Sequence, residues 1–162
     1  MESRAEYADI QVAACVPGLL QLQKEINMLL PHGLEIMEIR EMQPPAGSLS
    51  VQIKGFSYDI TIPPDAAPDL SGLREKIVLF LQSPTVIITR ETKDKKVAKD
   101  IRPFVSDLAW DAEKNALTLR VLISPMGTVR PLEILTQVLG ISSELAWQAR
   151  IVKTETYWAE GQ

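Results

Sequence analysis

Residues 105–124 read Val105-Ser-Asp-Leu-Ala-Trp-Asp-Ala-Glu-Lys-Asn-Ala-Leu-Thr-Leu-Arg-Val-Leu-Ile-Ser124. Apolar and polar residues alternate on both sides of a short polar stretch, Asp111-Ala-Glu-Lys-Asn115. A period of two is typical of a strand with one buried face. Two such strands joined by a short polar connection are most simply paired as a hairpin. The segment therefore predicts an antiparallel sheet built on strands at 105–110 and 116–124.

The same pattern extends outward from this hairpin. Further strands are predicted at 7–14, 34–42, 56–62, 85–89, 97–101 and 148–158. Apolar residues at helical spacing predict helices that begin near Pro17, Asp69 and Pro131. Gly33, Pro84 and Gly140 end these helices. Residues 48–54 fit a strand or a helix equally well, and we leave both interpretations open.

Strands dominate this order, and helices separate some of them. The pattern predicts an α+β fold, a mostly antiparallel sheet with helices on one face. We expect one or two ferredoxin-like lobes. The turn-rich residues 63–68 are the expected lobe boundary, with an N-terminal part at 1–63 and a C-terminal lobe at 69–162. We expect the two parts to form one structural unit.

Composition excludes several classes of protein. Hydrophobic residues make up 46% of the 162 positions and charged residues 23%, which is the balance of an ordinary globular domain. The net charge of -4 argues against a dedicated DNA-binding domain but leaves room for local basic patches. No apolar run approaches the length of a membrane helix. The single cysteine, Cys15, allows no intrachain disulfide, so we expect a cytoplasmic protein.

Ligands for metals and groups for nucleophilic catalysis are scarce. Cys15 and His32 are the only thiol and imidazole, so the chain alone cannot build a zinc site of the usual type or an iron–sulfur cluster. A Ser-His-Asp arrangement would have to use His32. That residue lies in Leu30-Pro-His-Gly33, which we interpret as the turn that closes a helix. We therefore predict no metal site and no cofactor held by this chain.

The most unusual segment is Arg90-Glu-Thr-Lys-Asp-Lys-Lys-Val-Ala-Lys-Asp-Ile-Arg102. A basic hairpin of this kind can follow a phosphate backbone. The alternative is a solvated tip whose charges keep an exposed ribbon soluble. If the segment binds RNA or a substrate, its candidate residues are Arg90, Lys93, Lys95, Lys96, Lys99 and Arg102.

Two further candidates flank this segment. Arg130 belongs to Gly127-Thr-Val-Arg-Pro131, which enters a helix, and backbone N–H groups at a helix start favour anions. A plain turn is the alternative there. Asp100 and Arg102, two positions apart on one strand, would share a face and could pair. We assign no catalytic residue, and Asp100 is retained as a candidate only if the domain modifies RNA.

Several segments together resemble a bacterial family, the radical SAM-linked domain of unknown function. The match covers nearly the whole chain and rests on the order and spacing of Ala5-Glu-Tyr-Ala-Asp-Ile10, Leu30-Pro-His-Gly-Leu-Glu-Ile36, Thr89-Arg-Glu-Thr-Lys-Asp-Lys-Lys96, Asp100-Ile-Arg-Pro103, Gly127-Thr-Val-Arg-Pro131 and Thr156-Tyr157. The family's domain occurs alone or fused to the C-terminus of cobalamin-binding radical SAM proteins. It normally begins with a further N-terminal region, so we expect this chain to lack that part.

The resemblance implies a partner rather than a self-sufficient enzyme. A radical SAM protein would supply the iron–sulfur cluster, S-adenosylmethionine and cobalamin. Genes of the family often neighbour those of an E/G-type ribonuclease and of ribosomal proteins, which points to RNA. We therefore expect a noncatalytic module that binds the substrate or the partner of a radical SAM enzyme, in RNA modification or metabolism. The alternatives are an RNA-modifying domain resembling pseudouridine synthases, and a structural or self-association domain.

Overall fold

A computed structural model describes residues 2–12, 18–41, 49–63, 72–91 and 95–159. The chain divides into two compact units. The larger unit combines residues 1–6 with residues 52–162, and the smaller unit is formed by residues 7–51. Within the described ranges, no helix is long and apolar enough to cross a membrane.

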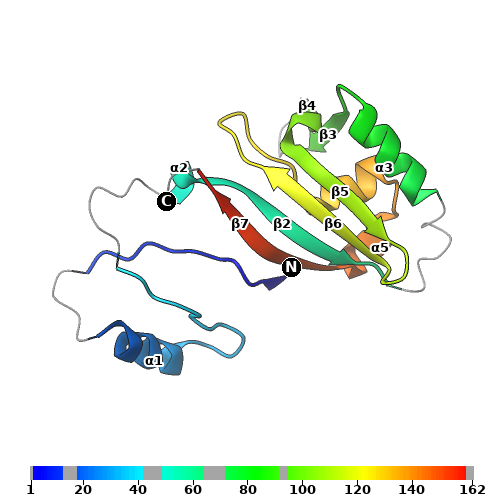
Figure 1. Cartoon of the computed structure of the whole chain (residues 1–162). Helices are drawn as coiled ribbons and strands as arrows, with labels where there is room; N and C mark the ends of the chain where they lie inside the picture. The colour runs from blue at the N-terminus through cyan, green and yellow to red at the C-terminus, as the bar shows by residue number, and fades with distance from the viewer. Residues whose placement is uncertain (1, 13–17, 42–48, 64–71, 92–94, 160–162) are drawn as a thin grey trace. The chain divides into compact units, whose positions relative to one another are not determined.

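The larger unit is built on a five-stranded sheet with the order β1-β7-β2-β6-β5, and Figure 1 shows the four long strands side by side. All neighbouring strands pair antiparallel except β1, which pairs with β7 in parallel. A second, two-stranded sheet contains β3 and β4. The strands are β1 (Glu2–Ser3), β2 (Ile53–Thr61), β3 (Ile87–Glu91), β4 (Lys96–Asp100), β5 (Val105–Asp111), β6 (Ala116–Leu122) and β7 (Arg150–Trp158).

The connections between these strands are those of a ferredoxin-like fold. With the β3–β4 hairpin set aside, the chain runs β2, α3 (Leu73–Gln82), β5, β6, a helical stretch, and β7. In space, β7 and β6 lie on either side of β2, and β5 lies beyond β6. This is the βαββαβ arrangement in which each pair of parallel strands is separated by an antiparallel one. The expected α+β class and its antiparallel sheet are confirmed.

Alternation along the strands places one hydrophobic core on the helix side of the sheet. Tyr58 and Ile60 of β2 are buried there, beside the buried residues Leu117, Leu119 and Val121 of β6. The core is completed by residues of α3 and of the helical stretch after β6, namely Leu73, Ile77, Phe80, Ile134, Leu135 and Leu139. Every second residue is buried along much of β2 and β6, and α3 buries one apolar face. The sequence pattern predicts both features.

The helical stretch between β6 and β7 differs from the single helix expected at 131–139. It begins as predicted with α4 (Pro131–Glu133), because the missing N–H of proline costs nothing at a helix start. It then widens into a π-helical turn, η3 (Ile134–Val138), where Leu139 N–H bonds to Ile134 O over five residues. After Gly140, with a φ of 69°, a second helix that the sequence analysis missed follows, α5 (Ser143–Gln148).

Residues 2–6 attach to the β7 edge of the sheet. Lys153 of β7 is buried, and its ammonium lies 4.4 Å from the centre of the Phe56 ring and 2.6 Å from a carboxylate oxygen of Glu6. Thr156 Oγ1 donates a hydrogen bond of 2.8 Å to Ala5 O. The hydrogen bond from Lys153 lowers the pKa of Glu6, although partial burial opposes the shift. These contacts explain why a two-residue strand remains on the sheet.

The smaller unit contains the expected helix but not the expected strands. Helix α1 spans Leu19–Leu29. Residues 7–12 and 34–41 carry no strand pairing, and positions 13, 14 and 42 of the predicted strands lie outside the described residues. Asn27 explains part of this difference, because its side chain bonds both the N–H (2.7 Å) and the C=O (3.0 Å) of Ile36. A side-chain amide thus satisfies the backbone that a neighbouring strand would otherwise pair.

Positions 64–68 of the expected boundary at 63–68 lie outside the described residues. The two compact units divide between Glu6 and Tyr7 and between Val51 and Gln52. Strand β2 is hydrogen-bonded on both sides, to β6 and to β7, so residues 53–61 cannot belong to a separate N-terminal lobe. The open choice at 48–54 is also settled, since α2 (Leu49–Gln52) ends where β2 begins.

Gly55 is the position at which the central strand tolerates no side chain. A Cβ there would lie 2.2 Å from the backbone oxygen of Val121 on β6. We expect Gly55→Ala to lower the free energy of unfolding by at least about 3 kcal/mol, because two strands would have to separate. Gly72→Ala is the matched control: its φ is 74°, but no atom of the described residues lies within 4 Å of the added Cβ, so only backbone strain of about 1 kcal/mol is expected. Equal losses in urea denaturation would contradict this assignment.

Candidate nucleic-acid interface at the basic hairpin

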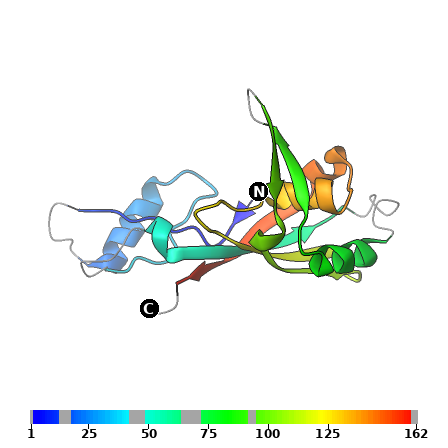
Figure 2. The ribbon, with the colours of Figure 1, turned by 90° about the horizontal axis from the view of Figure 1, so that it is seen from above.

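The β3–β4 hairpin, residues 87–100, projects away from the five-stranded sheet (Figure 2). Its two strands pair in register from Ile87 with Asp100 to Glu91 with Lys96. Four of the predicted RNA-binding residues lie on this hairpin, and Arg102 follows it directly. Lys93, also predicted, lies outside the described residues.

The side chain of Arg90 is bonded to residues in the body of the unit. Its guanidinium makes a two-pronged ion pair with Glu133, with Nε to Oε1 and Nη2 to Oε2 both at 2.6 Å. Nη2 also donates to Thr128 O at 2.7 Å, and the backbone N–H of Arg130 donates to Glu133 Oε2 at 2.8 Å. The side chains are only 25% and 11% exposed. Arg90 therefore joins the hairpin to the start of α4 and is not available to a phosphate.

The charge of Glu133 depends on these partners. Burial pulls the pKa of Glu133 upward, but hydrogen bonds from the Arg90 side chain and the Arg130 backbone outweigh burial and hold the pKa below its ordinary value. A carboxyl with a lowered pKa in the folded state stabilises the fold above its unfolded pKa. That contribution is lost as the pH falls through the lowered value.

The side chain of Asp100 is also bonded within the unit, to backbone N–H groups. Its Oδ1 accepts hydrogen bonds from Val86 N–H at 2.9 Å and from Arg102 N–H at 3.1 Å. The expected side-chain pairing of Asp100 with Arg102 is therefore wrong: the contact runs through the backbone of Arg102, which has left the strand for a 3₁₀ turn, η2 (Arg102–Phe104). The carboxylate considered as a catalytic candidate holds the end of the hairpin.

Arg102 points inward rather than toward solvent. Nη1 donates to Val105 O at 2.7 Å, Nη2 donates to Leu81 O at 2.9 Å, and the guanidinium lies 5.4 Å from the centre of the Phe80 ring. Its Nε is buried and has no hydrogen-bond partner among the described residues. Arg102 thus links β5 with the end of α3, and its guanidinium stabilises the fold.

Lys99 is half-buried at the base of the hairpin. Its ammonium lies 4.6 Å from the centre of the Phe104 ring and donates to Met126 O at 3.1 Å. Burial, and then repulsion from Arg90, lower the pKa of Lys99, while Glu133 opposes the shift. Nearby Gly127 has a φ of 118°, a backbone conformation that residues other than glycine rarely adopt, which explains glycine at that position.

The remaining predicted cations are exposed. Lys96 pairs with Glu91 at 2.7 Å, and both side chains are more than two-thirds exposed. Lys95 and Arg130 are exposed as well. Near Arg130, the first turn of α4 already holds the carboxylate of Glu133, so the anion expected at this helix start is supplied by the chain itself. The structure thus divides the six described residues of the predicted set into three that hold the hairpin, Arg90, Lys99 and Arg102, and three that are exposed, Lys95, Lys96 and Arg130.

Sequence reasoning missed the residues that hold the hairpin from the other side. Glu133 was not singled out as a candidate. A glutamate three residues after the N-cap residue, which here is Arg130, is typical of a capping box. Gln137 was also missed, and its Oε1 accepts the N–H of Thr89 on the edge of β3 at 3.0 Å. Within the described ranges, no group of three or more His, Cys, Asp or Glu residues is placed to hold a metal ion.

The fold and this site define an α+β domain of ferredoxin-like topology with an added basic hairpin. The chain belongs to the family described as an uncharacterized protein conserved in bacteria (DUF2344), whose model matches residues 1–131. No curated protein and no solved structure gives a significant match to the chain. Membership of a bacterial domain family of unknown function is thereby confirmed, and the association with radical SAM proteins stays a prediction.

We expect Arg90→Ala to cost about 3 kcal/mol of stability, because it leaves the Glu133 carboxylate buried without its partner. Replacing both residues, Arg90→Met with Glu133→Leu, should recover part of that loss. Lys96→Ala, which breaks the exposed pair with Glu91, should change stability by about 0.5 kcal/mol or less.

Thermal denaturation gives the stabilities, and amide exchange of residues 87–91 shows whether the hairpin has come loose. An Arg90→Ala protein that melts like the wild type with unchanged exchange would contradict the role given to this ion pair.

Proposed function

We propose that this domain is a noncatalytic binding module that presents the β3–β4 hairpin to RNA on behalf of a radical SAM enzyme. The observation that carries the proposal is that some charged residues of the hairpin bond to the body of the unit while others are exposed. Asp100 fixes the base of the hairpin, and Arg90, which lies opposite Val97, fixes β3 to the body one pair before the ladder ends. Lys95 and Lys96, in contrast, are exposed. A ribbon fixed at both points loses little conformational freedom on binding.

The internal bonds of the hairpin base support binding over catalysis. The Asp100 carboxylate and the Arg102 guanidinium are the groups that an RNA-modifying reaction would have used. Both are bonded to backbone atoms of this chain. General acid–base catalysis needs a group within hydrogen-bonding reach of the substrate, and these groups are already engaged.

Local charge supports a polyanionic ligand. The chain as a whole carries a net charge of -4, yet residues 93, 95 and 96 are all lysines in a stretch of four. Lys95 and Lys96 are exposed, and the Glu91 partner of Lys96 is exposed too, so phosphate can compete for that ammonium. About two or three phosphate contacts are expected, which makes binding weak, nonspecific and dependent on salt.

The partner enzyme is inferred from the family resemblance. In this proposal the radical SAM protein holds the iron–sulfur cluster, S-adenosylmethionine and cobalamin, and the present domain positions the substrate. The scarcity of thiol and imidazole ligands in the sequence agrees with this division.

Salt dependence tests RNA binding. We expect the affinity for a single-stranded RNA to fall with a slope of log K against log salt near -2, at about 0.7 per phosphate contact. Changing Lys93, Lys95 and Lys96 to Ala should bring that slope close to zero without unfolding the protein, because the exposed side chains of Lys95 and Lys96 contribute little to stability. Fluorescence anisotropy from low to physiological salt measures both slopes.

The matched control changes Lys24, Arg74 and Lys114 to Ala, which removes the same charge from other exposed positions. The control should keep the slope of the wild type. If the hairpin variant keeps it as well, or both variants lose it equally, the hairpin is only a solvated tip and the RNA proposal fails.

Association with the enzyme is tested separately. A tagged form of the chain, expressed in its source organism, should co-purify with a radical SAM protein identified by mass spectrometry. The purified chain alone should bind neither S-adenosylmethionine nor cobalamin in calorimetry. Stoichiometric binding of either compound, or of an iron–sulfur cluster, by this chain alone would overturn the assignment to a cofactor-free module.

A further inference from the structure

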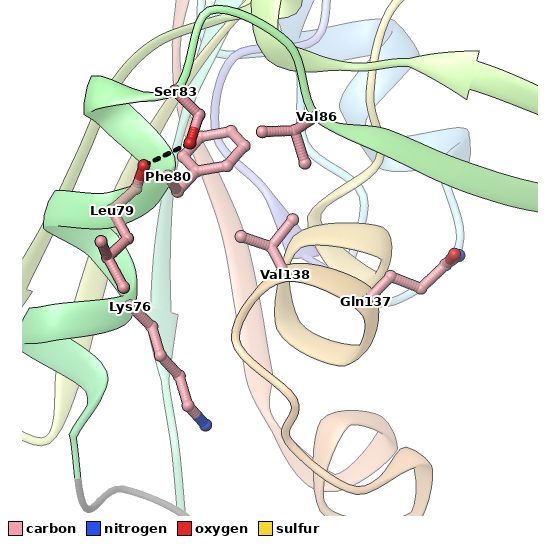
Figure 3. A pocket seen from close by; sticks show the side chains of 7 residues that line it. All are labelled: Lys76, Leu79, Phe80, Ser83, Val86, Gln137 and Val138. Atoms are coloured by element: carbon pink, nitrogen blue, oxygen red, sulfur yellow. Dashed lines mark hydrogen bonds between the residues drawn. The ribbon is translucent and has the colours of Figure 1, made fainter.

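A hollow of about 230 Å³ lies between α3 and the π-helical turn η3. Figure 3 shows Phe80, Val86 and Val138 grouped around it, with Leu79 on the same side as Phe80. Lys76 and Gln137 extend along its margins. The hollow therefore has an apolar floor and a polar rim.

Two polar side chains of the rim, Lys76 and Gln137, offer hydrogen-bond donors. The ammonium of Lys76 has three N–H groups and donates one of them to Leu139 O at 2.6 Å. Gln137 uses its carbonyl oxygen to accept the N–H of Thr89, which leaves its amide hydrogens for another partner. The Ser83 hydroxyl donates its proton to Leu79 O at 2.6 Å and keeps only acceptor lone pairs. Among the described residues no carboxylate lines the hollow, so beside Lys76 its complement is an apolar group next to an anionic acceptor.

The size and surroundings of the hollow favour a protein segment over a free metabolite. Pockets that enclose small ligands usually exceed about 300 Å³, whereas this one suits a single large side chain. Apolar surface continues beyond it, because Leu79 is 65% exposed and Ile87, which follows Val86, is 58% exposed. Exposed apolar residues around a pocket with a charged rim are typical of an anchoring site in a protein interface.

The π-helical turn gives the hollow its far wall. Val138 and Gln137 both belong to η3, where the chain makes bonds over five residues instead of four. Such turns are rare and often lie at functional sites. The widened turn also places Gln137 where its side chain reaches the β3 edge, so the same element serves the hairpin and the hollow.

We propose that this hollow is a docking site for an acidic segment of a partner protein, which inserts one large apolar side chain between α3 and η3 and places a carboxylate on Lys76. The apolar side chain would contact Phe80, Leu79 and Val138. The carboxylate would take the N–H groups of Lys76 that Leu139 does not use. This site does not depend on RNA binding by the hairpin.

The test uses the full chain, labelled with ¹⁵N, and two capped pentapeptides. One peptide has phenylalanine between glutamates, and the other has glutamines in place of the glutamates. We expect the acidic peptide to shift amide signals of residues 76–86 and 134–139 in a saturable manner, and the glutamine peptide to bind about fivefold more weakly. Free 4-phenylbutyrate should bind more weakly than the acidic peptide.

Three variants locate the contact. Leu79→Ala, which removes part of the wall, should weaken the acidic peptide about fivefold. Val78→Ala is its control on the same helix, because Val78 is exposed but does not line the hollow, and it should bind like the wild type. Lys76→Gln keeps an N–H donor and removes the charge, so it should reduce the preference for the acidic over the glutamine peptide.

Several results would overturn the proposal. Shifts outside the two segments, equal binding of the two peptides, or equal effects of Leu79→Ala and Val78→Ala would exclude an anchored acidic segment. Tighter binding of 4-phenylbutyrate than of the peptide would assign the hollow to a small carboxylate instead. If Lys76→Gln fails to fold, the comparison of Leu79→Ala with Val78→Ala and the comparison of the two peptides still decide the outcome.

Discussion

The ion pair between Arg90 and Glu133 sets the geometry on which the rest of the candidate site depends. It joins three segments that are distant in sequence: the β3–β4 hairpin, the turn at Thr128 and the start of α4. A guanidinium and a carboxylate in a two-pronged contact fix orientation as well as distance. The hairpin therefore leaves the body of the unit in a defined direction, although among the described residues its two strands pair only with each other.

The parts of the fold that follow from local patterns were predicted from the sequence. The alternation at Tyr58 and Ile60, and that at Leu117, Leu119 and Val121, gave strands whose buried faces are those observed. The 105–124 hairpin and helix α3 were predicted for the same reason, since period and burial determine each other in an amphipathic element. The position of β2 between β6 and β7 could not be predicted this way, because pairing partners depend on contacts between distant residues.

The candidate site was predictable in location but not in the role of each residue. A run of basic residues shows where positive charge is concentrated, but it does not show which cations have carboxylate or carbonyl partners elsewhere in the chain. Arg90 and Arg102 look the same in sequence as Lys95 and Lys96, yet the two arginines are held by Glu133, Leu81 and Val105. The expected strand at 34–42 failed for a similar reason, since the Asn27 amide takes the backbone groups of Ile36.

The parallel pairing of β1 with β7 has a consequence for the order in which the molecule assembles. Glu2 on β1 receives a two-pronged ion pair from Arg150 on β7, a partner 148 positions further along the chain. On the ribosome, β1 must therefore wait until the 148 positions up to Arg150 have been made before its neighbour exists. Residues 7–51 lie between and can make their own contacts earlier. Closure of so long a loop is slow, which makes attachment of β1 a late event in folding.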